Sequence, residues 1–187
     1  MRPQKSSEED VLSGLSQVFR ANGYEGASLT DLATAAGLKK ASLYHRFPGG
    51  KQAMAKAVFD YLGDRVQQVV FAVLTDANRP PETRLQDGLK SIYAFYDEGS
   101  TVCILRAMSM HVGQDLFPQE LAGGMGEWIK AFQNLGEALG LSTDKAKEYA
   151  IQTLTDIQGS LVVSKTLQDG GVFKGALARI ETRYLQA

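Results

Sequence analysis

Residues 28–51 read SLTDLATAAGLKKASLYHRFPGGK, and this stretch decides how the first part of the chain folds. Ser28 followed by Asp31 is the pattern of a helix capping box, and apolar residues then recur at helical spacing. Gly37 tolerates the positive φ that a tight turn between two helices requires. A second short helix is predicted at about residues 39–47, and Pro48 ends it. The stretch therefore predicts a helix-turn-helix.

The second predicted helix carries side chains suited to nucleic acid. Leu43 and Phe47 lie four residues apart and are expected to face inward. The other positions are hydrogen-bond donors and cations that match phosphates and base edges, namely Lys39, Lys40, Ser42, Tyr44, His45 and Arg46. A capped helix pair also occurs in bundles that do not bind DNA. However, residues 39–51 carry four Lys or Arg residues and no acidic residue, which favours DNA binding.

These residues resemble the DNA-binding domain of the tetracycline-repressor-like (TetR) family of bacterial transcription regulators. The resemblance covers roughly residues 6–60. It rests on Leu29-Thr30-Asp31-Leu32-Ala33, Gly37-Leu38, Lys40-Ala41-Ser42-Leu43-Tyr44 and His45-Arg46-Phe47 leading to Lys51. The segment Phe47-Pro48-Gly49-Gly50-Lys51 is similar to the branch of lincomycin- and multidrug-resistance repressors.

The resemblance implies that the partner is double-stranded operator DNA. The residues expected at the DNA are Ser28, Thr30, Lys39, Lys40, Ser42, Tyr44, His45 and Lys51. Base contacts are expected from Lys40, Ser42, Tyr44 and His45. Phosphate contacts are expected from Ser28, Thr30, Tyr44 and Lys51.

Charge is distributed unevenly along the chain. The 187 residues carry a formal net charge of −1, with 44% hydrophobic and 22% charged residues, as in an ordinary globular protein. Residues 1–55 hold seven Lys or Arg residues against five acidic ones, a net of +2, which leaves −3 for the remainder. A positive head on an acidic body indicates that only the head meets DNA.

The sequence lacks the signals typical of secreted proteins, membrane proteins, metal-binding proteins and common enzyme classes. The single cysteine, Cys103, excludes an internal disulfide and fits a reducing, cytoplasmic location. The chain opens without an apolar signal segment, and its most apolar run, residues 69–74, is too short to span a bilayer. Two histidines and one cysteine argue against a His/Cys metal site. Without a nucleophile-elbow, phosphate-loop or zinc-protease motif, we expect neither an enzyme nor a cofactor.

The periodicity of the whole chain predicts about nine helices and no strand, so the expected fold class is all-α. The first helix is predicted at residues 7–22, capped by Ser6 and Glu9 and ended by Gly23. A long helix of about six turns is predicted from Lys51. The helices expected after it lie at residues 82–97, 102–113, 117–139, 142–168 and 173–184. Three glycines within residues 123–126 predict a kink or a frayed start in one of them.

This layout predicts two domains. Residues 1–50 form a helix-turn-helix DNA-binding domain, and residues 51–187 form a helical effector-binding and dimerisation domain. The last two helices present stripes that fit either an intrachain core or a four-helix bundle between two copies. The resemblance favours a homodimer through these two helices.

The middle of the body is rich in large, soft side chains. An ordinary core explains any one of them, but a pocket for a small, mostly apolar effector is also possible, and the resemblance implies one. The expected lining residues are Tyr93, Tyr96, Met108, His111, Phe117, Trp128 and Phe132. The interpretation is a ligand-responsive repressor released from a palindromic operator. A helical enzyme that binds a small molecule, or a protein-interaction module, remains an alternative.

Overall fold

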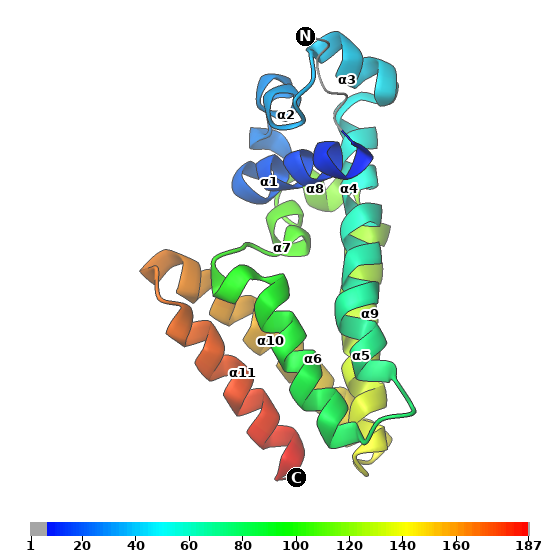
Figure 1. The fold of residues 1–187 in the computed structure, drawn as a ribbon, viewed down its shortest axis with the longest axis vertical. Coiled ribbons are helices and arrows are strands. Elements are labelled where there is room, and N and C mark those ends of the chain that lie inside the picture. The colour runs from blue at the N-terminus through cyan, green and yellow to red at the C-terminus, as the bar shows by residue number, and fades with distance from the viewer. Residues whose placement is uncertain (1–6, 187) are drawn as a thin grey trace. The chain divides into compact units, whose positions relative to one another are not determined.

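The computed structural model describes residues 7–186, and every regular element in that range is a helix (Figure 1). The predicted all-α class is confirmed. Two compact units share the chain. The first unit contains the described residues up to Gly63 together with Ile104–Leu121, and the second contains Asp64–Cys103 together with the described residues from Ala122. These two units are defined by which residues pack together. The predicted boundary at residue 50 separates DNA binding from effector binding, and it stays a prediction.

Helix α1, Glu8–Gly26, opens the first unit with a capping box one residue later than expected. The Ser7 hydroxyl accepts a hydrogen bond from the Asp10 backbone N–H at 3.0 Å, and the Asp10 carboxylate accepts one from the Ser7 backbone N–H at 3.1 Å. The predicted box used Ser6, which lies outside the described residues. Gly23 has φ 65° and ψ −174°, so it kinks the helix. The helix then continues for three more residues instead of ending there.

Helix α1 packs directly on α2, Leu29–Ala35, and this contact has no room for a side chain at Gly14. A Cβ atom on Gly14 would lie 2.1 Å from the carbonyl oxygen of Ala35. The apolar face that α1 buries consists of Val11, Leu15, Val18 and Phe19. The backbones of α1 and the end of α2 therefore meet at Gly14.

The predicted long helix is present but is not a uniform α-helix. It runs through α4, Gly50–Val66, into a π-helical turn η1, Gln67–Phe71, and ends with α5, Ala72–Thr75. The periodicity did not predict the π-turn, because its apolar residues suit either helix type. A π-turn inside an α-helix holds one extra residue in the turn.

The single helix predicted at residues 102–113 is wrong, because two short helices occupy that region. They are α7, Ile104–Met108, and α8, Val112–Leu116, and His111 between them has φ 49°. Gly113 returns so close to α7 that a Cβ there would lie 2.3 Å from the Met108 carbonyl oxygen. Both short helices pack on α1.

The second unit is built from longer helices. They are α6, Pro81–Phe95, the 3₁₀ turn η2, Asp97–Gly99, most of α9, Pro118–Ala138, then α10, Thr143–Leu167, and α11, Gly170–Leu185. Both α6 and α10 pack on α11 (Figure 1). The Ser142 and Asp169 side chains cap α10 and α11.

The kink expected from the glycines of α9 is wrong. Gly123, Gly124 and Gly126 lie inside a continuous helix, and none of them adopts a positive φ. Glycine lowers helix propensity but does not force a helix to bend. Buried Leu121 and Trp128 on either side of the cluster hold this part of α9 in place.

The contact at Gly14 yields a test of the fold. Gly14→Ala is expected to lower the free energy of unfolding by about 1–3 kcal/mol, because the new methyl group meets a backbone carbonyl that cannot rotate away. Gly63→Ala is the control, since a methyl group on Gly63 of α4 would have nothing within 4 Å, and it should stabilise by about 0.5–1 kcal/mol. Chemical denaturation measures both. Equal effects of the two substitutions would contradict the close contact.

Candidate nucleic-acid interface

Helix α3 spans Lys40–Arg46, and the turn that joins α2 to it has the geometry that the sequence predicts. The Ser28 hydroxyl caps α2 by accepting a hydrogen bond from the Asp31 N–H at 3.1 Å, and it donates to the Asp31 carboxylate at 2.6 Å. Gly37 adopts φ 64°. The N–H of Leu38 then reaches back to the Ala33 carbonyl at 2.9 Å, which closes the C-terminus of α2.

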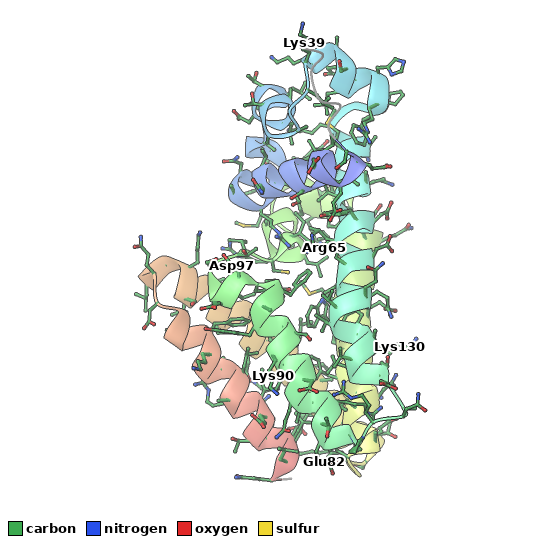
Figure 2. The ribbon with its side chains drawn as sticks, viewed as in Figure 1. Lys39, Arg65, Glu82, Lys90, Asp97 and Lys130 are labelled. Carbon is green, nitrogen blue, oxygen red and sulfur yellow. The ribbon has the colours of Figure 1, made fainter. Side chains whose placement is uncertain are left out.

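Helix α3 presents most of its side chains to solvent. Leu43 is buried, with 1% of its surface exposed, and anchors the helix to the unit. Figure 2 shows Lys39 extending outward just before the first turn of α3. The other exposed side chains of this surface are Lys40, Ser42, Tyr44, His45 and Arg46. This exposed surface, which we call the α3 face, contains no carboxylate.

Most of the predicted DNA contacts therefore gather on or beside one helix. Ser28 and Thr30, at the start of α2, are also exposed. Among the eight predicted residues, Lys51 is the one whose side chain is half-buried.

Lys51 has a structural role that the sequence did not suggest. Its ammonium group donates to the carbonyl oxygens of Ala27 at 3.2 Å and Glu25 at 3.4 Å. It also lies 4.6 Å from the ring centroid of Tyr24. Lys51 thus joins the first turn of α4 to the connection between α1 and α2, the segment that leads into the helix-turn-helix.

Tyr24 is the aromatic half of this junction. Its ring lies 5.2 Å from Phe117 and 6.3 Å from Phe19, and burial raises the pKa of its hydroxyl above the usual value. Phe117 also contacts Phe59 of α4. Aromatic packing and the Lys51 ammonium therefore hold α1 and α4 together beneath the α3 face.

The seven predicted effector residues are divided between the two units. Met108, His111 and Phe117 belong to the first unit, where Met108 and Phe117 are buried and His111 is exposed. The sequence analysis placed them in the body by their position after residue 50, and an apolar pattern does not reveal which helices they pack against. In the structure, the segment from Ile104 to Leu121 belongs with the DNA-binding head.

The other four predicted residues do lie in the second unit. Tyr96, Trp128 and Phe132 are buried and in ring contact, with centroids 6.3 Å apart for Tyr96–Trp128 and 6.5 Å for Trp128–Phe132. Tyr93 is half-buried, and its hydroxyl donates a hydrogen bond to the Glu98 carboxylate at 3.3 Å.

Sequence reasoning missed further members of this aromatic cluster. Phe71 of η1 meets Trp128 edge-on at 5.1 Å, and Phe173 of α11 contacts Tyr96 at 6.0 Å. Tyr184 lies 6.1 Å from Phe132, and burial raises its pKa to about 12. These residues come from helices distant in sequence, so no local pattern connects them.

The part of the chain that the structure describes offers neither a metal site nor a membrane span. No group of three or more His, Cys, Asp or Glu side chains is placed to hold a metal ion there. Within residues 7–186, no helix is both long and apolar enough to cross a bilayer.

Known proteins resemble both the head and the whole chain. The family described as "Bacterial regulatory proteins, tetR family" matches residues 11–58. The HTH-type transcriptional regulator LmrA of Bacillus subtilis is 26% identical over 168 residues, which cover 87% of this chain and 88% of LmrA.

Solved structures extend the likeness to the complete fold. A TetR transcriptional regulator from Legionella pneumophila superposes with a TM-score of 0.82 at 19% identity, covering 98% of this chain and 99% of that one. A cysteine mutant of the TetR-family regulator CifR, complexed with 26-bp double-strand operator DNA, has a TM-score of 0.76 at 26% identity and covers 100% and 99%.

The position of Lys51 predicts a stability effect. Lys51→Met is expected to lower the free energy of unfolding by about 1 kcal/mol, because two carbonyl oxygens lose their charged donor. Lys39→Met removes the same charge from an exposed site and should change stability by less than about 0.5 kcal/mol. Thermal and chemical denaturation of both variants provide the measurement. If the two substitutions are equally neutral, the Lys51 junction contributes nothing to the head.

Proposed function

Because the chain belongs to the TetR family of bacterial transcription regulators, we propose that it is a homodimeric repressor that leaves a palindromic operator when a small effector binds. The observation that carries the proposal is the α3 face, where exposed donors and cations surround one buried anchor, Leu43. Such a helix fits the major groove, where base edges present distinct hydrogen-bonding patterns. The operator complex of CifR, a relative at 26% identity, supports the same use of this fold.

In this proposal the side chains divide by role. Lys40, Ser42, Tyr44 and His45 read base edges, while Ser28, Thr30 and Lys39 contact phosphates along with Tyr44. Lys51 acts mainly by holding α4 against the α1–α2 connection, because two carbonyl oxygens already occupy its ammonium group. A regulator of this kind works where the chromosome is, so the proposed location is the cytoplasm.

The outward faces of α10 and α11 support a dimer. The exposed residues of α10 from Ala150 to Ser164 include no charged side chain. The large apolar side chains exposed on the two helices are Ile151, Val162, Val163, Leu167 and Leu185. On α11, small residues recur at the exposed Gly171, Ala178 and Thr182 and at the half-buried Gly175. A second copy of the same two helices would complete a four-helix bundle across a two-fold axis.

The effector is proposed to bind in the second unit, beside the aromatic cluster of Tyr96, Trp128 and Phe132. Aromatic walls suit a mostly apolar molecule, and Trp128 is the sole tryptophan of the chain. An effector changes DNA affinity only if it binds the two states of the regulator unequally.

Operator recognition can be tested by selecting bound DNA from a random pool. We expect a palindrome whose half-site centres lie about 34–36 Å apart, or a multiple of that distance. Lys40→Ala should then relax the preference at one position of each half-site by about 1–3 kcal/mol. Uniform weakening on every sequence would assign Lys40 to phosphate instead, and failure to enrich any sequence would remove the proposed function.

The dimer can be tested with one charge on the apolar face. The protein should sediment at about twice 20.3 kDa. Val163→Lys places a cation at a position that is 44% exposed in one chain, so it should dissociate the dimer without unfolding it. Val112→Lys, at 41% exposure on α8, is the matched control and should leave the mass unchanged. A Val163→Lys variant that remains dimeric would place the interface elsewhere.

A further inference from the structure

Arg84, near the start of α6, is a buried cation that lacks a protein partner. The residue is 9% exposed, and its Nε atom is buried without a hydrogen bond. Among the described residues, no carboxylate or carbonyl oxygen pairs with its guanidinium group. A buried N–H group without a hydrogen-bond partner is costly to folding, so the Nε atom of Arg84 calls for an explanation.

Two other arginines of the second unit do have carboxylate partners. Arg79 pairs with Asp87, and Arg183 pairs with Asp156. Asp87 is only three residues from Arg84, yet Lys90 and Arg79 are the cations that lower its pKa. Asp87, the carboxylate about one turn along the helix from Arg84, is therefore paired with other cations.

Arg84 lies on the buried edge of α6, and α6 packs against α5 and η1. Gly88, one turn further along this edge, touches Leu74 so closely that a Cβ atom would lie 2.2 Å from the Leu74 side chain. Phe71 of η1, a turn that also packs on α6, meets Trp128 edge-on. Arg84 and the aromatic cluster thus belong to the same compact unit.

We propose that Arg84 anchors the carboxylate of a mostly apolar organic acid and that this acid is the effector. The inference rests on the proposed function and specifies its ligand. A guanidinium group offers parallel N–H donors that match the two oxygens of a carboxylate. The terminal Nη groups are the part of Arg84 that stays accessible, so they can receive such a ligand.

The proposed charge of the ligand, −1, follows from Arg84 being the one cation that the proposal assigns to the site. A monoanion against one arginine leaves no charge uncompensated, whereas a phosphate dianion would keep one negative charge without a partner. The sequence alone predicted a small, mostly apolar effector, because no charged residue of the body could be placed as a partner for a charged one. The burial of Arg84 replaces that expectation.

Matched acids and amides test the inference. The probes are 2-naphthoate and 3-phenylpropionate, each compared with its primary amide at constant ionic strength. Binding is followed by Trp128 fluorescence and by calorimetry. The wild-type protein should bind each acid at least about tenfold more tightly than its amide. Arg84→Met should abolish this preference, and Arg84→Lys should retain only part of it, since an ammonium group lacks the planar pair of donors.

A control arginine separates a specific effect from a general change of charge. Arg79→Met removes an arginine that already has a carboxylate partner, so the preference for the acids should persist in this variant. Equal affinity for acid and amide in the wild type, or no response to either acid, overturns the inference. The loss of the preference in Arg79→Met as strongly as in Arg84→Met also overturns it.

Thermal unfolding without any probe gives a second, independent test. If Arg84 serves a ligand, its buried Nε lacks a partner in the free protein, so Arg84→Met should raise the melting temperature. Arg183→Met breaks the pair with Asp156 and should lower it. If Arg84→Met lowers the melting temperature as much as Arg183→Met, Arg84 is a structural group and the inference fails.

DNA binding is measured separately, so that the two proposals can fail separately. If the acids bind through Arg84 while selection from the random pool enriches no operator, the anion site stands and the proposed repressor does not. If an operator is found but acids and amides bind alike, the repressor stands and the anion site does not. If the acids bind through Arg84 without releasing the operator, the site is confirmed as an anion site but the acid is not the effector, which overturns that part of the inference.

Discussion

The backbone contact between α1 and the end of α2 at Gly14 is the constraint on which the DNA-binding head depends. It brings two helices closer than any side chain larger than hydrogen permits, and α3 follows α2 after a single tight turn at Gly37. Lys51 adds a second attachment, from the first turn of α4 to the carbonyl oxygens of Ala27 and Glu25. The α3 face is therefore held by backbone contacts behind it, which leaves its own side chains free to vary with the operator.

The two units place charge in opposite ways. The head exposes the cations of the α3 face and satisfies Lys51 with carbonyl oxygens, whereas the second unit pairs Arg79 and Arg183 with carboxylates and leaves Arg84 without one. Exposed cations favour rapid, salt-dependent association with a polyanion. A single, mostly buried arginine instead favours a small ligand of opposite charge. DNA binding and the proposed binding of an organic acid would therefore rest on different physical means.

The sequence predicted those features that depend on near neighbours. The Ser28 cap and the Gly37 turn involve residues three to five positions apart, and both were predicted correctly. The limits of α10 and α11 were also close, because helical periodicity is local. The partners of Lys51 lie 24 and 26 residues away and are backbone atoms, so no residue pattern marks them. No residue pattern marks the packing of Met108 and Phe117 in the first unit or the burial of Arg84 either, because both depend on which helices pack together.

The π-turn η1 sets a limit on how the chain length can change in evolution. Removal of one residue from Gln67–Phe71 would leave a regular α-helix, which is locally more stable than the π-turn. Everything after the deletion would, however, rotate by about 100° around the helix axis. Leu74 would then leave its close contact with Gly88, and α5 would turn a different side toward α6. Substitutions are therefore tolerated in this turn more readily than a change in its length, and a relative that lacks the extra residue must pack α5 and α6 through a different set of side chains.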